Sequence, residues 1–371
     1  MRILVVNAGS SSLKLSVLDD GDRVVASENL PAPRGRVDET ALRQAIERCA
    51  PIEAVGHRIV HGGTEFVEAT PLVPGVVQRL RALTDLAPLH QPKSLRGVEV
   101  VSRALPGVPA VACFDTAFHA GMPAAASTYA IPPEWRKRWD LRRFGFHGLS
   151  HAWASRRAAD LMGRPVEAVR VVTCHLGAGA SLCAVRGGRS VDTTMGFTPL
   201  EGLVMATRSG TVDPGLLLWL EEHVGMPPSE LASTLEHRSG LLGLTGTADM
   251  RSILQAEADG SEEAATAIEV YLHRLRAGIA AMAAAMDGLD ALVFTGGVGE
   301  GSPVIRSRTA RGLGFLGVEI DEDASTARDP EADIGAGKAQ VRVFVVRARE
   351  DLEIARQVRA LLEGPGGRPE M

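Results

Sequence analysis

The sequence predicts an α/β fold built from two similar halves. Short apolar runs bounded by Gly, Asn or Asp alternate with longer segments of helical period, as in α/β proteins. Two stretches, Val5–Val17 and Thr173–Val185, share a pattern of strand, Gly/Ser-rich turn and strand, although few residues are identical between them. With 371 residues, the chain is long enough for two domains. One such hairpin in each half would suit a nucleotide held between two similar domains.

Most of the strands are predicted by seven apolar runs, which are Arg2–Val6, Lys14–Leu18, Val108–Cys113, Arg170–Cys174, Ser181–Val185, Asp290–Thr295 and Val341–Val346. A further strand is expected to end in the segment 57–63. The clearest helix has apolar residues in steps of 4, 3, 4, 3 and 4 from Ile268 to Met286, which predicts a buried face. A second helix closes the chain, with Ile354, Val358 and Leu361 on one face.

Composition and charge argue against several classes of protein. A hydrophobic content of 45% is typical of a globular protein, and a net charge of −5 argues against a broadly basic nucleic-acid binder. The four cysteines form no Cys-x-x-Cys pair, which disfavours a disulfide framework and a zinc ribbon. The first apolar run stops at Asn7, and Ile279–Met286 is too short to span a bilayer. We therefore expect a soluble, cytoplasmic protein without a signal peptide.

Three glycine-rich turns have the character of phosphate-binding loops. The first, residues 7–14, combines Gly9 with three hydroxyls and one lysine, although it is not a Walker A loop; alone, it could also be a plain turn. The second, residues 175–181, has glycines two apart. The third, residues 296–300, is either a bare strand-to-helix turn or a surface on which adenine and ribose lie flat. Because ligands gather at the carboxyl ends of strands in open α/β sheets, the three turns together indicate a nucleotide site.

Charged side chains occur beside these turns. Arg58 and Arg208 both stand in segments rich in glycine, where a guanidinium offers a rigid donor fork to a carboxylate or phosphate. Asp115 follows the apolar run 108–114, which places a carboxylate at the end of a strand. The segment 142–151 adds two arginines, two aromatic residues and two histidines.

Two pairs of histidines, His57 with His61 and His147 with His151, have a spacing of four residues that also occurs in zinc sites. Neither pair carries the glutamate of an H-E-x-x-H motif, and no further cluster of ligands follows at a suitable spacing. We therefore expect the second histidine of each pair to cap a helix or pack in the core.

Taken together, these motifs resemble the acetate kinase family, a branch of the acetate and sugar kinase/Hsp70/actin superfamily. The resemblance runs from Asn7 to about Ala355 and rests on NAGSSSLK, HRIVHGG, LAPLH, FDTAFH, RRFGFHGLSH and DTTMGFTPLEG in this order. It implies two duplicated actin-like (ribonuclease H-like) domains with a central cleft, formed by residues 1–117 with 351–371 and by residues 118–350. The implied activity is the reversible, ATP-dependent phosphorylation of acetate to acetyl phosphate by direct in-line transfer, with propionate as the closest rival substrate. A homodimer is implied as well.

The resemblance also implies roles for individual residues. Asn7 and Glu350 would help to hold Mg²⁺ or Mn²⁺, and Arg58 and Arg208 would clamp the substrate carboxylate and the transferring phosphoryl group. Asp115 would be a catalytic residue. The other implied positions are the phosphoryl contacts His147 and His175; the phosphate-loop residues Ser10, Ser12, Lys14, Gly177 and Gly179; the methyl pocket Val60, Leu89, Phe146 and Pro199; and the active-site and nucleotide positions His90, Asp249, Met250, Arg251, Gly297 and Gly299.

The chemistry of this reaction fits such a set of residues. A carboxylate nucleophile has a pKa of about 4, so it is already ionised at neutral pH and needs no strong general base. The reaction instead needs two like-charged reactants held in line, with positive charge around the phosphoryl oxygens. We therefore interpret Asp115 as a residue that orients the metal or the phosphoryl group rather than as a base.

The sequence departs from the family pattern around the nucleotide. The differing positions are Ala178, Ala180, Gly301 and the pair Ala348-Arg349, where the family usually has Asn, Ser, Asn and Thr-Asn, and Glu350-Asp351 in place of Glu-Glu. Each lost amide could remove a hydrogen bond of about 0.5–1.5 kcal/mol. These changes affect phosphoryl-donor preference and turnover more than the acyl substrate. Two alternatives stay open: a nucleotide-binding protein that has lost its activity, and a metal-dependent hydrolase built on the His and Asp positions.

Overall fold

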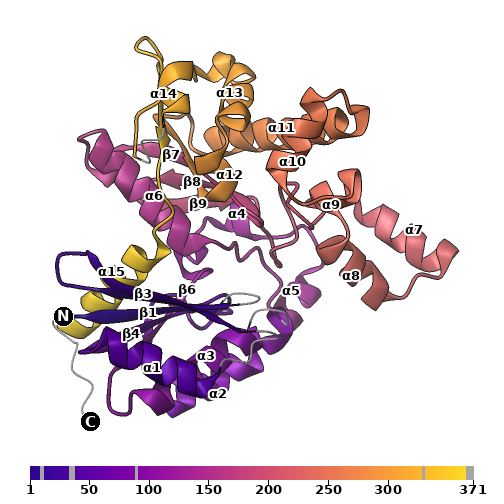
Figure 1. The fold of residues 1–371 in the computed structure, drawn as a ribbon. Helices are drawn as coiled ribbons and strands as arrows, with labels where there is room; N and C mark the ends of the chain where they lie inside the picture. The colour runs from indigo at the N-terminus through magenta and orange to yellow at the C-terminus, as the bar shows by residue number, and fades with distance from the viewer. Residues whose placement is uncertain (9–11, 33–37, 88–90, 328–330, 365–371) are drawn as a thin grey trace. The chain divides into compact units, whose positions relative to one another are not determined.

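The computed structural model describes residues 1–8, 12–32, 38–87, 91–327 and 331–364. The chain forms two compact units (Figure 1). Unit 1 consists of Met1–Ala120, Phe146–Trp153 and Arg349–Met371, and unit 2 consists of Gly121–Gly145 and Ala154–Ala348. Each unit has one mixed sheet with helices packed on it, which confirms the predicted α/β class. Among the described residues, every helix is too short or too polar to cross a membrane.

The sheet of unit 1 has the strand order β3-β2-β1-β4-β6-β5. Its first three strands form an antiparallel meander, and β4 and β6 continue the sheet parallel to β1. The short β5 closes the edge antiparallel to β6. The strands are β1 (Ile3–Ala8), β2 (Ser12–Leu18), β3 (Val24–Pro31), β4 (Ala54–Ile59), β5 (Thr70–Pro71) and β6 (Ala110–Phe114).

Helices cover both faces of this sheet, because β1 is apolar on both sides. Leu4 and Val6 point to a core shared with α1 and α3, whereas Ile3 and Val5 point to a core shared with α15. Gly56 on β4 permits the second contact, since a Cβ atom there would lie 2.4 Å from Ile354 of α15. The helices of this unit are α1 (Glu39–Cys49), α2 (Pro74–Ala82), η2 (Thr84–Leu86), α3 (Gln91–Ala104), η3 (Ala117–His119), the start of α6 (Gly148–Leu161) and α15 (Glu350–Glu363).

The sheet of unit 2 has the strand order β11-β10-β7-β8-β9. Here too an antiparallel meander, β7-β8-β9, is extended by two parallel strands beside its first strand. The strands are β7 (Arg170–Leu176), β8 (Ala180–Arg186), β9 (Arg189–Thr193), β10 (Ala291–Thr295) and β11 (Arg342–Val345). Both units therefore share one topology, which confirms the duplication predicted from the two hairpins.

The longest helix of unit 2 is α11, and it packs on β7, β8 and β9. All six apolar residues predicted for its buried face, from Ile268 to Met286, are buried. Helix α12 follows β10 and contacts both β7 and β10. The remaining helices are α4 (Ala124–Ser127), α5 (Pro133–Trp139), η4 (Val166–Ala168), α7 (Pro214–Val224), α8 (Pro228–His237), α9 (Gly240–Thr245), α10 (Met250–Ala258), α11 (Glu262–Ala285), α12 (Gly296–Gly301), α13 (Pro303–Arg311), η5 (Gly314–Leu316) and α14 (Glu322–Thr326).

One local prediction needs correction. The segment from Gly296 to Glu300 contains three glycines, a composition that predicts a turn. The structure instead has a helix there, α12. Its first N–H group, that of Gly296, donates to the Glu300 carboxylate at 2.9 Å, and the N–H of the distant Ala348 donates to the same carboxylate. These bonds help to compensate for the low helix propensity of glycine.

Candidate active site

In unit 1, Arg58 forms a bidentate ion pair with Asp115. Arg58 lies near the carboxyl end of β4, and Asp115 follows the parallel neighbour β6 directly. The Nε and Nη2 atoms of Arg58 donate to the two carboxylate oxygens of Asp115 at 3.1 and 2.7 Å. The pair therefore lies at the carboxyl ends of two strands. Asp115 is only 1% exposed, so its carboxylate is closed off from water.

Two more polar residues complete this cluster. The Nη1 atom of Arg58 donates to the Asn7 side-chain oxygen at 3.3 Å and lies 3.4 Å from the Glu350 carboxylate. The Asn7 amide nitrogen in turn donates to Glu350 at 3.3 Å. Asn7 comes from β1 and Glu350 from the first turn of α15, so four distant segments meet at Arg58. Although burial lowers the pKa of the Arg58 guanidinium, the charges of Asp115 and Glu350 raise it further, and the net pKa is above its ordinary value.

The donor set of this cluster fits a hard divalent cation. Asn7 and Glu350 offer amide and carboxylate oxygens, the ligands that Mg²⁺ prefers, and they lie within hydrogen-bonding distance of each other. Few protein ligands are needed, because Mg²⁺ is commonly bound by one or two carboxylates together with substrate phosphates. Lys14 stands opposite Asn7 in the antiparallel β1–β2 pair, and residues paired in this way project from the same face of a sheet. One strand pair therefore places a positive charge beside the candidate metal ligands.

The segment Phe146–Gly148 lies in the same unit. Phe146 is buried, and the edge of the His61 ring meets the Phe146 ring at a centroid distance of 5.5 Å. Val60 precedes His61, so two of the residues implied for the methyl pocket belong to neighbouring parts of unit 1. His147 follows Phe146 with a left-handed backbone, φ 55°. As expected, His61 and His151 are buried in the core.

Unit 2 carries the second glycine-rich turn at the end of β7. His175 is the last residue but one of β7, and the N–H of Gly177 donates to the carbonyl of Gly179 at 2.9 Å, which closes the turn. The carbonyl of Ala178 accepts from Ala206 at 3.1 Å. Ala180 starts β8 and is fully buried. Ala180 is therefore part of the sheet core, whereas Ala178 is exposed.

A pocket of about 440 Å³ in unit 2 brings together predicted nucleotide-binding residues from three distant segments. Gly177 comes from the turn after β7, and Gly297 from the first turn of α12. The N-cap of α10, Asp249, lines the pocket with Met250 and Arg251. Apolar residues from the loop 204–206, α9 and α12 form the rest of the wall; they include Ala206, Leu241 and Val298.

Several predicted site residues are not part of this pocket wall. They are Ser12 and Lys14 in unit 1 and, in unit 2, His175, Gly179, Gly299 and the predicted phosphoryl clamp Arg208. Gly299 is on the buried side of α12, where a Cβ atom would lie 3.6 Å from the Cys174 carbonyl, so this glycine serves close packing of α12 on β7 and is not part of the pocket wall. Arg208 is largely buried beside the pocket segment, and its Nη1 atom donates to the carbonyl of Pro199 at 2.8 Å. Burial lowers the pKa of the Arg208 guanidinium, and the nearby Glu236 opposes this shift. Ser10, Leu89 and His90 lie outside the described residues.

Among the described residues, no group of three or more His, Cys, Asp or Glu side chains is placed to hold a metal ion.

Comparison with known proteins identifies the family. The acetokinase family model matches residues 34–356. The chain is 45% identical to the acetate kinase of Clavibacter michiganensis subsp. michiganensis over 393 residues, which covers 98% of this chain and 99% of that protein.

The chain belongs to the acetokinase family.

Two solved structures share the acetokinase fold with this chain. The acetate kinase of Porphyromonas gingivalis superimposes with a TM-score of 0.90 at 34% identity, covering 97% of this chain and 99% of that one. A propionate kinase from Francisella tularensis subsp. tularensis gives a TM-score of 0.89 at 34% identity, covering 96% and 99%. The resemblance inferred from the motifs is therefore confirmed, as is the fold class.

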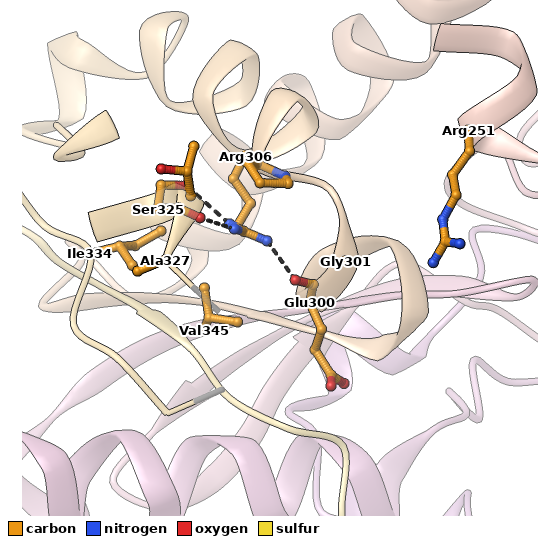
Figure 2. Close-up of a pocket in the computed structure, with 10 residues that line it drawn as sticks. Arg251, Glu300, Gly301, Arg306, Ser325, Ala327, Ile334 and Val345 are labelled. Atoms are coloured by element: carbon orange, nitrogen blue, oxygen red, sulfur yellow. Dashed lines mark hydrogen bonds between the residues drawn. The ribbon is translucent and has the colours of Figure 1, made fainter. Parts of the chain in front are cut away.

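Sequence reasoning missed two residues that hold helix α12 in place beside the pocket, Glu300 and Arg306. Arg306 on α13 is 2% exposed, and its Nη1 atom donates to the carbonyl of Gly299 at 2.8 Å. The same atom donates to the carbonyl of Glu300 at 2.8 Å (Figure 2). Its other donors bond to the hydroxyl and the carbonyl of Ser325. The Glu300 carboxylate accepts from the backbone N–H groups of Gly296 and Ala348 at 2.9 Å. Together these bonds tie down both ends of α12. In the sequence, the only sign of these bonds is an arginine six residues after a glutamate, which is a weak signal.

A second pocket of about 660 Å³ adjoins the first. Arg251 and Gly301 line both pockets, and Figure 2 shows Arg251 and Arg306 on different sides of the larger one. A Cβ atom on Gly301 would meet nothing within 4 Å. The missing side chain at this position therefore leaves open space where the family pattern has an asparagine.

Proposed function

We propose that the protein phosphorylates acetate with ATP and forms acetyl phosphate and ADP reversibly. The observation that carries this proposal is the convergence of Gly177, Asp249 and Gly297 on one pocket of about 440 Å³ in a chain of the acetokinase family. An oxygen of the acetate carboxylate attacks the γ-phosphorus, the bond from phosphorus to the bridging oxygen breaks, and ADP leaves with the electron pair.

The roles of the residues follow from the charges of the reactants. Acetate and the γ-phosphoryl group are both anionic, so we propose that Arg58, Arg208 and Lys14 reduce their repulsion. His147 and His175 would donate hydrogen bonds to the phosphoryl oxygens. Because acetate is already ionised at neutral pH, none of these groups has to remove a proton from it.

Asp115 is assigned to orientation. Both of its carboxylate oxygens accept hydrogen bonds from Arg58, which leaves it poorly placed to act as a base. Asp115→Asn should lower kcat by about 100-fold, the usual cost of losing one preorganised charged contact, and should weaken the dependence on divalent metal. Normal turnover with an unchanged metal dependence in Asp115→Asn would show this assignment to be wrong.

Members of this family need a divalent cation, and we propose that it is Mg²⁺, with Mn²⁺ able to replace it. Asn7 and Glu350 would hold the ion through their side-chain oxygens. When bound, the cation supplies positive charge to the phosphate oxygens. Metal titration of the Asn7→Ala variant, read as the metal concentration at half-maximal rate, tests this role.

The choice of acyl substrate depends on the apolar residues that would receive its methyl group, which by resemblance to the family are Val60, Leu89, Phe146 and Pro199. We propose that acetate is preferred and that propionate is a weaker substrate, because one methylene in an apolar pocket changes binding by only about 1–3 kcal/mol. A solved propionate kinase has the same fold as this chain. The fold by itself is therefore compatible with either acid as the substrate. A hydroxamate assay with ATP, Mg²⁺ and acetate, propionate or butyrate in parallel ranks the acids, with Arg208→Ala as the inactive control. ATP binding without acyl phosphate from any acid would favour the inactive nucleotide-binding alternative.

We further propose a homodimer, with a cytoplasmic location where ATP is available. Helix α7 supports the dimer. None of its residues is buried, and its large apolar side chains Leu216, Leu218 and Trp219 are 47–57% exposed. Apolar side chains that are exposed together in this way are commonly covered by a partner, and the same patch on a second copy can cover them in a two-fold interface. Light scattering should give the mass of two chains, and Leu218→Asp should give the mass of one. A wild-type mass of one chain would refute the dimer.

A further inference from the structure

The Phe146–Gly148 turn has a conformation that its own sequence does not favour. His147 has φ 55°, in the left-handed region that residues other than glycine rarely adopt. The turn presents Phe146 and His147, which the proposed function assigns to the methyl pocket and to the phosphoryl group. A turn of this kind persists only where surrounding contacts fix it.

His119 supplies one of these contacts. It is fully buried at the end of η3, and its Nε2 atom lies 3.0 Å from the carbonyl oxygen of Phe146. A carbonyl oxygen only accepts hydrogen bonds, so Nε2 must carry the proton. Burial lowers the pKa of His119 to about 4, partly opposed by this hydrogen bond, so the ring is neutral at pH 7. His119 is therefore a neutral donor with a fixed tautomer that binds the backbone of the turn.

His61 contacts the same residue from another side. Its Nδ1 atom accepts a hydrogen bond from the N–H of Gly63 at 2.9 Å, so that nitrogen carries no proton. Burial lowers the pKa of His61 to about 4, which makes the neutral Nε2–H tautomer the form present at pH 7. The ring packs edge-on against the ring of Phe146, with an interplanar angle of 70°. His61 therefore fixes the aromatic ring, whereas His119 fixes the backbone.

The other end of the turn is tied to the ion-pair cluster. The N–H of Gly148 donates to the carbonyl of Asp115 at 2.9 Å. A Cβ atom on Gly148 would lie 2.2 Å from that carbonyl oxygen, so only glycine permits the contact. η3, which carries His119, begins two residues after Asp115. The turn is thus fastened on both sides to the segment that starts at Asp115.

We infer that His119 and His61 are positioning residues, which act through Phe146 to fix the place of the methyl pocket wall and of His147. The inference rests on the proposed roles of Phe146 and His147. Loss of the His119 donor would remove this hydrogen bond to the Phe146 carbonyl and release the backbone of the turn. The acyl pocket would then discriminate less between acetate and propionate, and His147 would be less well oriented for phosphoryl transfer.

Three variants test this inference. His119→Leu has a similar volume but no donor, His119→Gln restores an N–H that reaches the carbonyl, and His57→Leu is a matched control. His57 is also a buried histidine, and burial lowers its pKa to about 3, but it stands within the strand β4 and not in η3 or the turn. We expect His119→Leu to lower kcat for acetate at least 10-fold, with the KM for ATP within twofold. It should also shift the acetate-to-propionate ratio of kcat/KM at least threefold.

The controls separate positioning from stability. His119→Gln should return both values to within threefold of the wild type, and His57→Leu should lower the melting temperature without moving the selectivity ratio. A folded His119→Leu variant with wild-type kcat and selectivity would overturn the inference. Imidazole ¹⁵N shifts of the wild-type chain give a test that needs no variant, because a protonated Nδ1 on His119 would also overturn it. Failure of the wild type to form acetyl phosphate would instead refute the proposed function, and leaves the tautomer measurement intact.

Discussion

The two units carry the same kind of ion pair at opposite ends of the same sheet topology. In unit 1, Arg58 and Asp115 form a bidentate pair between the carboxyl ends of the parallel strands β4 and β6. In unit 2, Arg170 and Asp290 form one between the amino ends of the parallel strands β7 and β10, at 3.1 and 2.9 Å. Ligands of open α/β sheets bind at the carboxyl ends, so its position in the sheet supports the proposed substrate role of the Arg58–Asp115 pair and not of the Arg170–Asp290 pair.

The two ion pairs also differ in their neighbours and in their exposure. Arg58 has Asn7 and Glu350 as additional neighbours, and Asp115 is almost completely buried. The additional partner of Arg170 is the carbonyl of Asp287 in a surface turn, and both members of this pair are partly exposed. Identical chemistry of the pair therefore does not imply an identical role. The role of such a pair depends on its exposure and on whether it lies at the carboxyl or the amino ends of the strands.

Removal of the two arginines should give the largest contrast. Arg58→Ala leaves the buried Asp115 without its counter-ion, which should lower the free energy of unfolding by about 3–5 kcal/mol. It also removes a charged contact that we propose for the reacting anions, so kcat/KM should fall by about 100-fold or more. Arg170→Ala should stay within about threefold of the wild type. Both variants are measured by hydroxamate formation, with circular dichroism to check folding. Equal losses of activity in two folded variants would remove the distinction.

A bulky residue in the proposed nucleotide pocket should affect only the KM for ATP. A Cβ atom on Gly297 would meet nothing within 4 Å, so Gly297→Val fits the fold but extends into the pocket. Overpacking costs about 1–3 kcal/mol, which predicts an increase of about 10-fold in the KM for ATP with the KM for acetate unchanged. Gly314→Val is the control, because that glycine is equally open but lies outside the pocket. A matching rise in the KM for acetate would contradict the separation of the two sites.

The opposite change is expected at Gly301. Gly301→Asn restores an amide at a position with free space that lines the same pocket. One hydrogen bond of about 0.5–1.5 kcal/mol would lower the KM for ATP by about 2- to 10-fold. Isothermal titration with a non-hydrolysable ATP analogue measures the effect without turnover. Weaker binding of the analogue would show that the open space is used by the nucleotide itself.

The smallest effect concerns stability at the Arg170 pair. The hydrogen bond from Arg170 lowers the pKa of Asp290 below its ordinary value of 3.8. Such a group stabilises the folded state above its unfolded pKa, and this contribution disappears as the pH falls through the lowered folded pKa. Arg170→Ala should therefore reduce the free energy of unfolding by about 1 kcal/mol or less at pH 7, and by a smaller amount at pH 2. Urea unfolding of the wild type and of Arg170→Ala at the two pH values tests this. A difference in the free energy of unfolding that is the same at both pH values would contradict it.

Much of the fold was predictable because the buried strands are continuous apolar runs. β1, β7 and β10 are buried along most of their length, so the sequence alone locates them. The edge strands β3 and β9 were missed, since β3 is mostly exposed and breaks its apolar run at Ser27, and β9 is largely polar. Helix α12 was missed for a different reason: bonds from Arg306 and to Glu300 stabilise a glycine-rich helix whose own propensity is low.

By itself, the sequence determined the family, the duplicated α/β topology and the residue types of the site, because hydrophobic period and motif order are local properties of the chain. Only the tertiary structure decided which charged residues meet. Arg58 and Arg170 are both arginines in β-strands, and nothing in their sequence surroundings states that one faces Asp115, Asn7 and Glu350 while the other faces Asp290. The physical reason is that such contacts join residues up to 343 positions apart, and the sheet register that aligns them arises only when the strands pair.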